Sequence, residues 1–570
     1  MTNGRIIDIL ETTASLLELH DENAFKIKAL QSAVFNLDKQ TALLSELSLE
    51  ELEKLDGIGK SIAAKIFEIS QSGTTQELEF YISSTPPGVI EMLQIKGIGA
   101  KKVRALWKEL EVTTLDELMD ACKQDKVSAI KGFGEKTQEN VRKSIEFIIS
   151  QRGRFMYADA EDFAFRLEEK IKEANIAKYV SLAGDIRRKM ETVGLVQILL
   201  STADWQKANS FLDQFAWLEK DEVNSAPFVW RGEDKILHIK AEIRIYPEEK
   251  FASQLYLYSA GKYHLLSEAK DGITMMDYVR RKTFVSEEEI FTSLEMDFIL
   301  PEMREGFGET ELARKHELPK LVELTDMKGI LHNHSTYSDG KHTLEEMAMY
   351  CQELGYEYLG ITDHSKTATY ANGLQEFRIK KQHEEIDRLN EKLAPFKIFK
   401  GIESDILTDG SLDYTDEVLA SFDFIVSSIH SGFNMDEEKA TQRLVKAIEN
   451  PYTTILGHPT GRLLLKREGY PINHKRVIDA CAENNVVIEI NANPWRLDMD
   501  WRWVHYALEK KVMIAINPDA HEKNGYHDMK YGMYVGRKAG LTKELTFNAL
   551  SLEEMERWIV NKKTGVKSEK

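Results

Sequence analysis

Cysteine is nearly absent from this chain. Only three of its 570 residues are cysteines, at Cys122, Cys351 and Cys481, and no two of them form a CxxC pair. This scarcity excludes a disulfide framework and a thiolate zinc site, because both need several closely spaced cysteines. We therefore expect a protein of the reducing cytoplasm.

Two further absences restrict the class of protein. The sequence contains no run of about 18 apolar residues, and its start has no basic segment followed by an apolar core, so we expect neither a membrane span nor a signal peptide. Acidic residues also outnumber basic ones, which gives a formal net charge of −19. Any binding to nucleic acid must then come from local patches and backbone amides rather than from a global field.

Histidine, by contrast, is concentrated at one end of the chain. Of the 15 histidines, eleven follow residue 320. Many of these stand beside carboxylates in short motifs, namely LHNHS, YSDG, ITDHS, GIES, SSIHS, GHPTGR and NPDAH. Neutral imidazole and carboxylate together are the usual ligands of Zn, Mn or Fe. There are more ligands than one ion needs, which predicts a metal cluster able to carry out hydrolysis.

Most of these motifs come directly after apolar runs. From residue 328 onward, strand-like segments alternate with helical ones, and the strand-like segments are GILHNHS, YLGITDHS, FKIFKGIES, FDFIVSSIHS, TTILGHPT, VVIEINANP and VMIAINPDAH. Polar groups at the carboxyl ends of successive strands are typical of a (β/α) barrel. The length of 570 residues predicts three to five domains in all.

A three-fold repeat occupies the first 150 residues. LEKLDGIGKSIAAKI, LQIKGIGAKKVRALW and VSAIKGFGEKTQENV each place a GxG pair before a helix. Glycine permits a tight turn and close approach to a phosphate, and the free N–H groups that open the next helix attract an anion. One copy could be an ordinary connector, but three resemble the helix-hairpin-helix motif. Sequence-independent DNA contacts are then expected at Gly57, Gly59, Lys60, Lys65, Gly97, Gly99, Lys101, Lys102, Gly132 and Gly134.

The order of the histidine motifs resembles the PHP phosphoesterase domain. Together with the repeats ahead of it, nearly the whole chain resembles the bacterial family X DNA polymerases (PolX) with a C-terminal PHP domain. The resemblance implies a multidomain fold with an α-helical helix-hairpin-helix region, an α+β nucleotidyltransferase-like palm and thumb, and a distorted (β/α)7 PHP barrel. The implied domains are a helical 8-kDa-like domain at 1–80, a fingers-like region at 81–150, a degenerate palm at 151–230, a thumb-like domain at 231–318 and the PHP domain at 319–570.

The resemblance also implies a metal site. Carried over residue by residue, it gives nine ligands, which are His332, His334, Asp339, His364, Glu403, His430, His458, Asp519 and His521. It implies three divalent ions, zinc or manganese, with iron also open and magnesium less favoured by imidazole ligands. We assign Asp363 to catalysis or to orienting an imidazole. Arg462 is a candidate to clamp a phosphate oxygen, with a structural ion pair as the alternative, and Arg467 and Arg496 are weaker candidates.

The polymerase site of the family is eroded in this sequence. In the stretch AGDIRRKMETVGLVQILL, Gly184, Arg187 and Arg188 match the family, but Asp185 stands at the phosphate-binding serine. Leu195 and Gln197 stand at two metal-binding aspartates, and Glu242 stands at the third. One carboxylate cannot hold two Mg²⁺ ions against their hydration. We therefore expect the fold to be kept and nucleotidyl transfer to be lost.

These expectations combine into a DNA-repair protein whose PHP domain acts as a metal-dependent 3′-5′ exonuclease or 3′-end-processing phosphodiesterase. Its expected partner is gapped, nicked or 3′-ended DNA, and a monomer is one of the states open to it. The alternatives are an active polymerase X with an associated exonuclease, a small-molecule phosphatase built on the PHP barrel, and a non-catalytic DNA-binding scaffold. Lys65 aligns with the Schiff-base lysine of the related eukaryotic repair polymerase beta, although a solvated or phosphate-contacting lysine is the favoured alternative.

Overall fold

A computed structural model describes residues 3–37, 40, 42–95 and 97–564 of the chain. The chain divides into two compact units, Met1–Arg152 and Gly153–Lys570. Among the described residues, no helix combines the length and the apolar character that crossing a membrane requires.

The first unit is helical throughout its described part. Its α-helices are α1 (Asn3–Leu19), α2 (Ala24–Leu37), α3 (Leu49–Leu52), α4 (Lys60–Ser72), α5 (Gln76–Ser83), α6 (Pro87–Met92), α7 (Ala100–Glu109), α8 (Leu115–Lys123) and α9 (Glu135–Gln151). Leu10, Ile66, Val103 and Val141 are all completely buried in one hydrophobic core. The two N-terminal regions that we expected at 1–80 and 81–150 therefore share that core.

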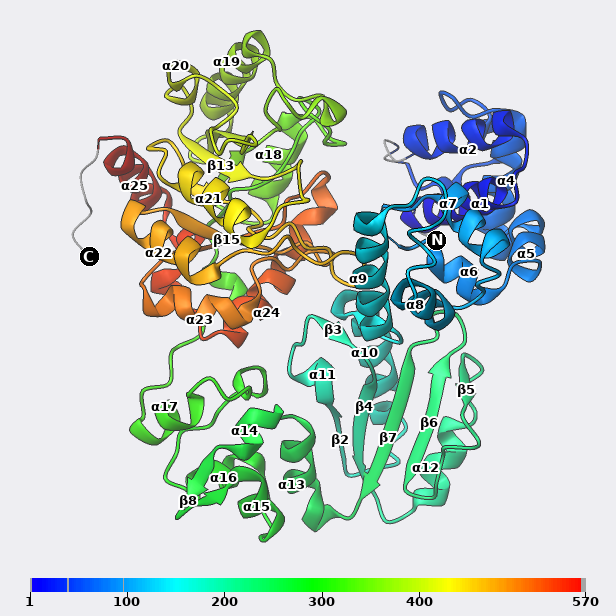
Figure 1. The fold of residues 1–570 in the computed structure, drawn as a ribbon. Helices are drawn as coiled ribbons and strands as arrows, with labels where there is room; N and C mark the ends of the chain where they lie inside the picture. The colour runs from blue at the N-terminus through cyan, green and yellow to red at the C-terminus, as the bar shows by residue number, and fades with distance from the viewer. Residues whose placement is uncertain (1–2, 38–39, 41, 96, 565–570) are drawn as a thin grey trace. The chain divides into compact units, whose positions relative to one another are not determined.

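The second unit begins with a five-stranded mixed sheet, which we call the middle sheet, in the order β2-β4-β7-β6-β5. The elements of this part are β1 (Phe155–Met156), α10 (Tyr157–Glu173), β2 (Tyr179–Ala183), α11 (Gly184–Arg187), β3 (Thr192–Val193), β4 (Val196–Ser201), α12 (Trp205–Leu212), β5 (Leu218–Lys220), β6 (Val229–Asp234) and β7 (Lys240–Tyr246). Figure 1 shows β2, β4, β7 and β6 side by side. Because β7 pairs with both β4 and β6, the sheet extends to Tyr246, past residue 230 where we expected the palm to end.

A small, mainly helical part follows the middle sheet. It contains α13 (Glu248–Tyr258), α14 (Lys262–Leu266), β8 (Glu268–Lys270), β9 (Ile273–Thr274), α15 (Met275–Arg280), α16 (Glu287–Thr292) and α17 (Glu309–Lys315). Ser286 begins α16 as its N-cap, since its hydroxyl accepts a hydrogen bond from the Glu289 backbone N–H.

The rest of the second unit is a barrel of seven parallel strands in sequential order. The strands are β10 (Gly329–Ile330), β11 (Tyr358–Ile361), β12 (Lys397–Asp405), β13 (Phe424–Ser428), β14 (Ile455–Leu456), β15 (Val487–Asn491) and β16 (Ile514–Asn517). A parallel bridge between Asn333 and Ala520 brings the segments after the first and last strands together, which nearly closes the barrel. Each of the seven segments that the sequence indicated as strands contains all or most of one of these strands.

Helices connect these strands and shield them from solvent. They are α18 (Leu344–Glu353), α19 (Glu376–Leu393), α20 (Asp416–Leu419), α21 (Glu437–Ile448), α22 (His474–Asn484), α23 (Trp501–Glu509), α24 (Met529–Lys538) and α25 (Leu552–Thr564). Inside the barrel, Phe399, Phe424 and Val487 form a buried cluster against which Met555 and Ile559 of α25 pack. The helical, mixed and barrel parts thus follow in the order expected from the sequence, and the fold class is confirmed.

Candidate metal centre and nucleic-acid contacts

All nine expected metal ligands lie at the carboxyl ends of barrel strands or just beyond them. His332, His334 and Asp339 follow β10, His364 follows β11, and Glu403 lies near the end of β12. His430 follows β13, His458 follows β14, and Asp519 and His521 follow β16. Because parallel strands end at the same rim of a barrel, ligands far apart in the sequence meet in one place.

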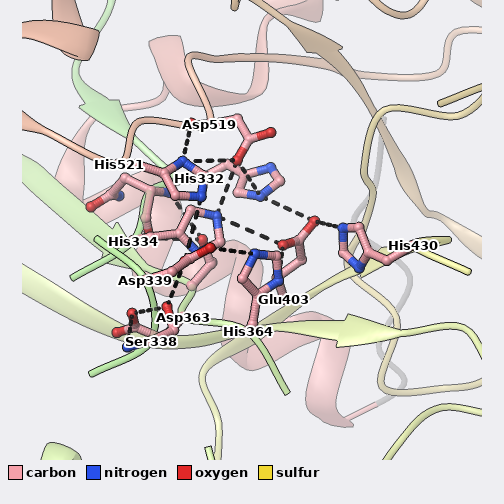
Figure 2. Close-up of polar contacts among 12 residues, drawn as sticks. His332, His334, Ser338, Asp339, Asp363, His364, Glu403, His430, Asp519 and His521 are labelled. Atoms are coloured by element: carbon pink, nitrogen blue, oxygen red, sulfur yellow. Dashed lines mark hydrogen bonds and ion pairs between the residues drawn. The ribbon is translucent and has the colours of Figure 1, made fainter. Parts of the chain in front are cut away.

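Glu403 lies at the centre of this group (Figure 2). Its Oε1 atom is 3.0 Å from His458 Nε2, 3.1 Å from His430 Nε2 and 3.3 Å from His332 Nε2. Its Oε2 atom is 2.9 Å from His364 Nδ1 and 3.7 Å from His334 Nε2. One carboxylate therefore touches five imidazoles and is placed to bridge more than one cation.

Two aspartates complete the cluster on either side of His334. Asp519 Oδ1 is 3.0 Å from His334 Nε2 and 3.5 Å from His332 Nε2. Asp339 lies 3.5 Å from His521 Nε2 and 3.7 Å from His364 Nε2. Four overlapping groups of three or four of these residues place their ligand atoms within 4.8 Å of one another. The geometry thus offers adjoining positions for several ions.

The burial of these groups fits a set of divalent cations. His332, His334 and Glu403 are completely buried. Among the described residues, His332 Nε2, His334 Nδ1 and Glu403 Oε2 have no hydrogen-bond partner. Buried polar atoms without partners are unfavourable, and nitrogen and oxygen donors of this kind suit Zn, Mn or Fe. The donor atoms therefore point to cations as their missing partners.

Without cations, protons must balance the buried carboxylates. Burial raises the pKa of Glu403, but His430, His332 and His364 outweigh it and hold that pKa well below its usual range. Burial lowers the pKa of His430, but Glu403 and Asp405 outweigh it and raise that pKa to about 10. The metal-free cluster thus pairs the carboxylate of Glu403 with the imidazolium ion of His430.

Two carboxylates that the sequence analysis missed orient ligand histidines by contacting their Nδ1 atoms. Glu489 on β15 lies 2.7 Å from His332 Nδ1, and Asp405 on β12 lies 2.5 Å from His430 Nδ1. Such contacts fix the ring and leave the other nitrogen free to bind a metal. The signal for Glu489 was a glutamate in the middle of the apolar run VVIEIN, because a buried carboxylate needs a partner.

Asp363 contacts serine and glutamine rather than an imidazole. Its carboxylate accepts hydrogen bonds from the backbone N–H and hydroxyl groups of Ser335 and Ser338 and from Gln382 Nε2, at 2.6 to 3.1 Å. The expectation that it orients an imidazole is therefore corrected, because its oxygens hold the loop that carries Asp339. A direct catalytic role for Asp363 stays a prediction.

Arg462 is already engaged within the barrel. Its Nη1 atom donates to Asp500 at 2.8 Å, and its other nitrogens donate to the carbonyl groups of Arg496 and Leu497. This is the structural ion pair that we named as the alternative. Arg467 donates to the Gly461 carbonyl, whereas Arg496 Nε lies 3.5 Å from Asp519 at the edge of the cluster.

The three glycine turns of the first unit share one geometry. The first glycine of each pair has a positive φ, +72° at Gly57, +85° at Gly97 and +89° at Gly132, which favours glycine. The second glycine of each pair, at 59, 99 and 134, is the N-cap of α4, α7 and α9 without a side-chain hydrogen bond. A Cβ atom at any of these three N-caps would meet nothing within 4 Å. Each of these three N-caps therefore borders open space, as close approach of a phosphate requires.

The lysines beside these turns differ in their surroundings. Lys60 is exposed on α4, and Lys101 is 84% exposed and lies 3.9 Å from Glu18. Lys102 lies over the ring of Phe133 at 5.3 Å. Lys65 is only 16% exposed and is paired with Glu77 at 2.5 Å. This ion pair occupies the amino group that Schiff-base chemistry would need free to attack.

The region where we expect the family's polymerase site contains a carboxylate neutralised by two arginines. Glu242 on β7 is 2.7 Å from Arg231 Nη2 and 2.6 Å from Arg244 Nε. Gln197 donates to Glu242 at 3.0 Å, and its side-chain oxygen lies close to Gly184. Burial raises the pKa of Glu242, but Arg244, Gln197 and Arg231 outweigh it and lower that pKa. The carboxylate is fully satisfied by protein groups.

The other residues of that site are also paired internally. Arg187 lies 2.5 Å from Glu287, and Arg188 lies 2.7 Å from Glu305. Asp185 accepts a hydrogen bond from the Gly194 backbone N–H at 3.3 Å. Leu195 lies between β3 and β4 and is half-buried.

Comparison with known proteins finds family matches for three stretches of the chain, two in the first unit and one in the barrel. Residues 1–75 match the family described as "Helix-hairpin-helix domain", residues 89–146 match "SAM-like Helix-hairpin-helix tandem" and residues 331–493 match "PHP domain". The chain is 36% identical over 573 residues to "DNA polymerase/3'-5' exonuclease PolX" of Bacillus subtilis (strain 168), across 97% of this chain and 98% of that protein.

Shorter relatives carry another name. A "Probable phosphatase" of Thermoanaerobacter sp. (strain X514) is 28% identical over 256 residues, which covers 43% of this chain and 99% of that protein. A "Probable phosphatase" of Caldanaerobacter subterraneus subsp. tengcongensis is 30% identical over 189 residues, covering 31% of this chain and 70% of that protein.

Proposed function

Since the chain belongs to the PolX family of DNA polymerase/3'-5' exonucleases, we propose that its barrel hydrolyses phosphodiester bonds at the 3′ ends of DNA in a reaction that requires divalent metal ions. The observation that carries this proposal is the convergence of Glu403 and eight further candidate ligands at the carboxyl rim of the barrel.

The chain's own residues prepare the site for this chemistry. Glu489 and Asp405 fix the rings of His332 and His430. Asp339 and His521 have the most exposed ligand side chains, at 33% and 37%, so substrate enters on their side. Three divalent ions, zinc or manganese, would supply Lewis acidity toward phosphate oxygens and lower the pKa of a water molecule for attack.

The helix-hairpin-helix turns bring DNA to the enzyme by its backbone. Contacts from free N–H groups to phosphate oxygens position a duplex without reading its sequence. This mode of binding suits a protein with a net charge of −19, because it does not need a basic surface. We propose gapped, nicked or 3′-ended DNA as the substrate class.

The exonuclease proposal is tested by digestion of 5′-labelled DNA with defined 3′ ends. The expected result is shortening from the 3′ end by wild type with Mn²⁺ and loss of shortening when His332→Ala and His334→Ala are combined. A matched control is His238→Ala, because His238 is an exposed residue outside the barrel whose partner is Glu233. Unchanged shortening in the double variant would remove the assignment of activity to the barrel.

We further propose that the middle sheet does not catalyse nucleotidyl transfer. The support is Glu242, whose carboxylate is occupied by Arg231 and Arg244 where the family places a metal ligand. Incorporation of labelled dNTP at a one-nucleotide gap with Mn²⁺ is the test, and we expect none above a no-enzyme control. Clear extension would show that the family's polymerase activity persists in this chain.

Small-molecule phosphatase activity is the second candidate, because shorter relatives carry that name. The phosphate-facing turns in the first unit favour DNA instead. The two candidate functions are distinguished by comparing kcat/KM for an oligonucleotide with kcat/KM for p-nitrophenyl phosphate. An exonuclease should have the higher value for the oligonucleotide. A preference for the monoester would favour the phosphatase.

A further inference from the structure

An exposed aromatic ring borders the entrance of the metal centre. Tyr370 belongs to the 3₁₀ turn η4 (Thr369–Ala371), in the loop after β11 that begins with the ligand His364. Its ring centre lies 6.2 Å from that of His364, yet the residue is 67% exposed. Among the described residues, nothing hydrogen-bonds to its hydroxyl group. An apolar ring of this size at the mouth of a polar site has a free face for a ligand.

The electrostatics of Tyr370 agree with this position. Partial burial first, and then Asp405, Glu403 and Asp339, raise the pKa of Tyr370 above its ordinary value. These are carboxylates of the metal centre or its support. The hydroxyl end of the ring therefore lies within their field while a large part of the ring faces solvent.

A hollow of about 400 Å³ adjoins the same entrance, lined by Thr336, Tyr337, Thr343, Leu344, Phe377, Arg378, Lys381 and Glu385. One wall is formed by Thr336, Tyr337 and Thr343, which flank Asp339 in the sequence. The other wall is the start of α19, where Phe377 is 66% exposed. A second aromatic ring thus lies on the Asp339 side of the metal centre.

Basic side chains outnumber acidic ones along this wall despite the acidic chain. Residues 366–381 contain four basic side chains and one acidic side chain, Glu376, which pairs with Lys366 at 3.7 Å. Of the charged side chains that line the hollow, Arg378 and Lys381 are basic and Glu385 is acidic. The Arg378 guanidinium donates to the carbonyl groups of Tyr337 and Asn372, so it keeps its charge without a carboxylate. No described carboxylate lies within ion-pair distance of Lys380 or Lys381. The patch is therefore complementary to phosphate.

The wall is also tied to the metal ligands. Gln382, next to Lys381 on α19, donates to Asp363 at 2.6 Å. Asp363 in turn holds Ser335 and Ser338 on either side of the hollow's Thr336 and Tyr337. The position of α19 is thus fixed relative to the loop that carries Asp339.

We propose that the loop at 365–374 and the first two turns of α19 bind the single-stranded 3′ end of DNA. In this arrangement the Tyr370 ring stacks on the terminal base, while Phe377, Arg378 and Lys381 hold the preceding nucleotide and its phosphate. Aromatic rings combined with a basic groove are the usual means of binding single strands without sequence preference. The inference rests on the proposed exonuclease function and names how its substrate is held.

The test uses a single-stranded oligonucleotide with 2-aminopurine as its 3′-terminal base and phosphorothioate linkages at that end to slow hydrolysis. Stacking on Tyr370 quenches the fluorescence of this base when full-length protein binds. We expect quenching with wild type and Tyr370→Phe, and its loss with Tyr370→Ala together with a Kd at least about fivefold weaker. Tyr263→Ala is the matched control, since Tyr263 is 70% exposed and lies on α14, outside the barrel.

The contact between Lys381 and a phosphate is tested by a separate measurement, the salt dependence of binding. Lys381→Gln should reduce the slope of log K against log salt by about 0.7, the value for one phosphate contact on a single strand. The proposed strand contact would be overturned if wild type did not quench the fluorescence, or if Tyr370→Ala still quenched it. Either result would count against the contact even if the enzyme shortens DNA. Quenching by an enzyme that does not shorten DNA would leave this contact in place and refute the proposed activity instead.

Discussion

Glu403 is the residue around which the metal centre is arranged. It is completely buried and lies 2.9 to 3.7 Å from five imidazole rings. In the absence of cations, protons on His332 and His430 compensate its charge, because the pKa of both rings is raised. Metal binding and proton binding are therefore alternatives at this site, and each should displace the other.

Metal affinity should consequently depend on pH. The pKa values of His430 and His521 are raised to about 10 and about 9, because nearby carboxylates outweigh burial. Both rings then carry protons at neutral pH, and cation binding must release them. We expect calorimetric titration of Mn²⁺ in buffers of different ionisation enthalpy to show release of about two protons or more, and affinity to rise with pH. Binding without proton release would contradict this charge balance.

The same shifts fix a pH window for the metal-free protein. Since the folded-state pKa values lie above the ordinary value of 6.5, the stability that these imidazolium ions contribute is complete below pH 6.5. It is lost as pH rises through about 9 for His521 and about 10 for His430. Thermal melts of chelator-treated protein across this range measure the loss.

Glu489 should act as a positioning residue for His332. Glu489→Gln keeps the shape of the side chain but weakens its contact with His332 Nδ1, so we expect metal affinity to fall about 10- to 100-fold. Glu483→Gln is the control, because Glu483 is exposed on α22 in the same part of the chain. Equal metal content and affinity in the two variants would argue against the positioning role.

At the residue scale, the sequence indicated the candidate ligands but not the residues that support them. Most candidate ligands follow an apolar run in a recognisable motif, whereas the partner of His332 is separated from it by 157 positions. Arg231 likewise meets Glu242 only through the pairing of β6 with β7. Such contacts depend on strand register, which the sequence pattern did not specify.

At the element scale, strand ends and glycine turns were predictable because their signals are local. The change from an apolar run to polar residues marks the end of a buried strand, and a GxG pair marks a tight turn. The C-terminal boundary of the middle sheet was harder to predict from the sequence. Strand β7 inserts between β4 and β6, so the sheet includes a strand that follows the expected boundary at residue 230.

The two glycines of a turn should respond differently to alanine. At Gly99 the backbone has φ −82°, which any residue adopts, and a Cβ would point into open space. Gly99→Ala should therefore leave stability nearly unchanged but weaken DNA binding, because the methyl group would meet the phosphate. Gly97 has φ +85°, so Gly97→Ala should also destabilise the fold by about 1 kcal/mol. Melting curves compare the stability of the two variants, and fluorescence anisotropy with a nicked duplex compares their DNA affinity. Normal DNA affinity in Gly99→Ala would refute phosphate contact at this turn.

At the scale of the whole molecule, the middle part and the barrel belong to one unit. Lys538 of α24 is completely shielded and lies 2.5 Å from Glu305, and its amino group also donates to the Arg188 carbonyl at 2.9 Å. Arg537 pairs with Glu302 at 2.8 Å. The region where we expect the family's polymerase site is thus joined to the barrel through Arg188 and Glu305.

We therefore expect calorimetry to show two unfolding transitions, one for each compact unit. Lys538→Met should lower only the transition of the second unit, by about 2 kcal/mol, because it removes one of the two cations that pair with the buried Glu305. Separate transitions for the middle part and the barrel, or a shift of both units together, would contradict this division.

The central claim is that the cluster around Glu403 binds metal and carries the exonuclease activity. The most direct measurement compares wild type with Glu403→Gln for bound metal per chain and for the rate of shortening of 5′-labelled DNA, while circular dichroism verifies folding. We expect the folded variant to lose metal and to lose shortening by at least about a thousandfold, or roughly 4 kcal/mol of barrier. A folded Glu403→Gln protein that holds wild-type metal and degrades DNA at the wild-type rate would contradict the account.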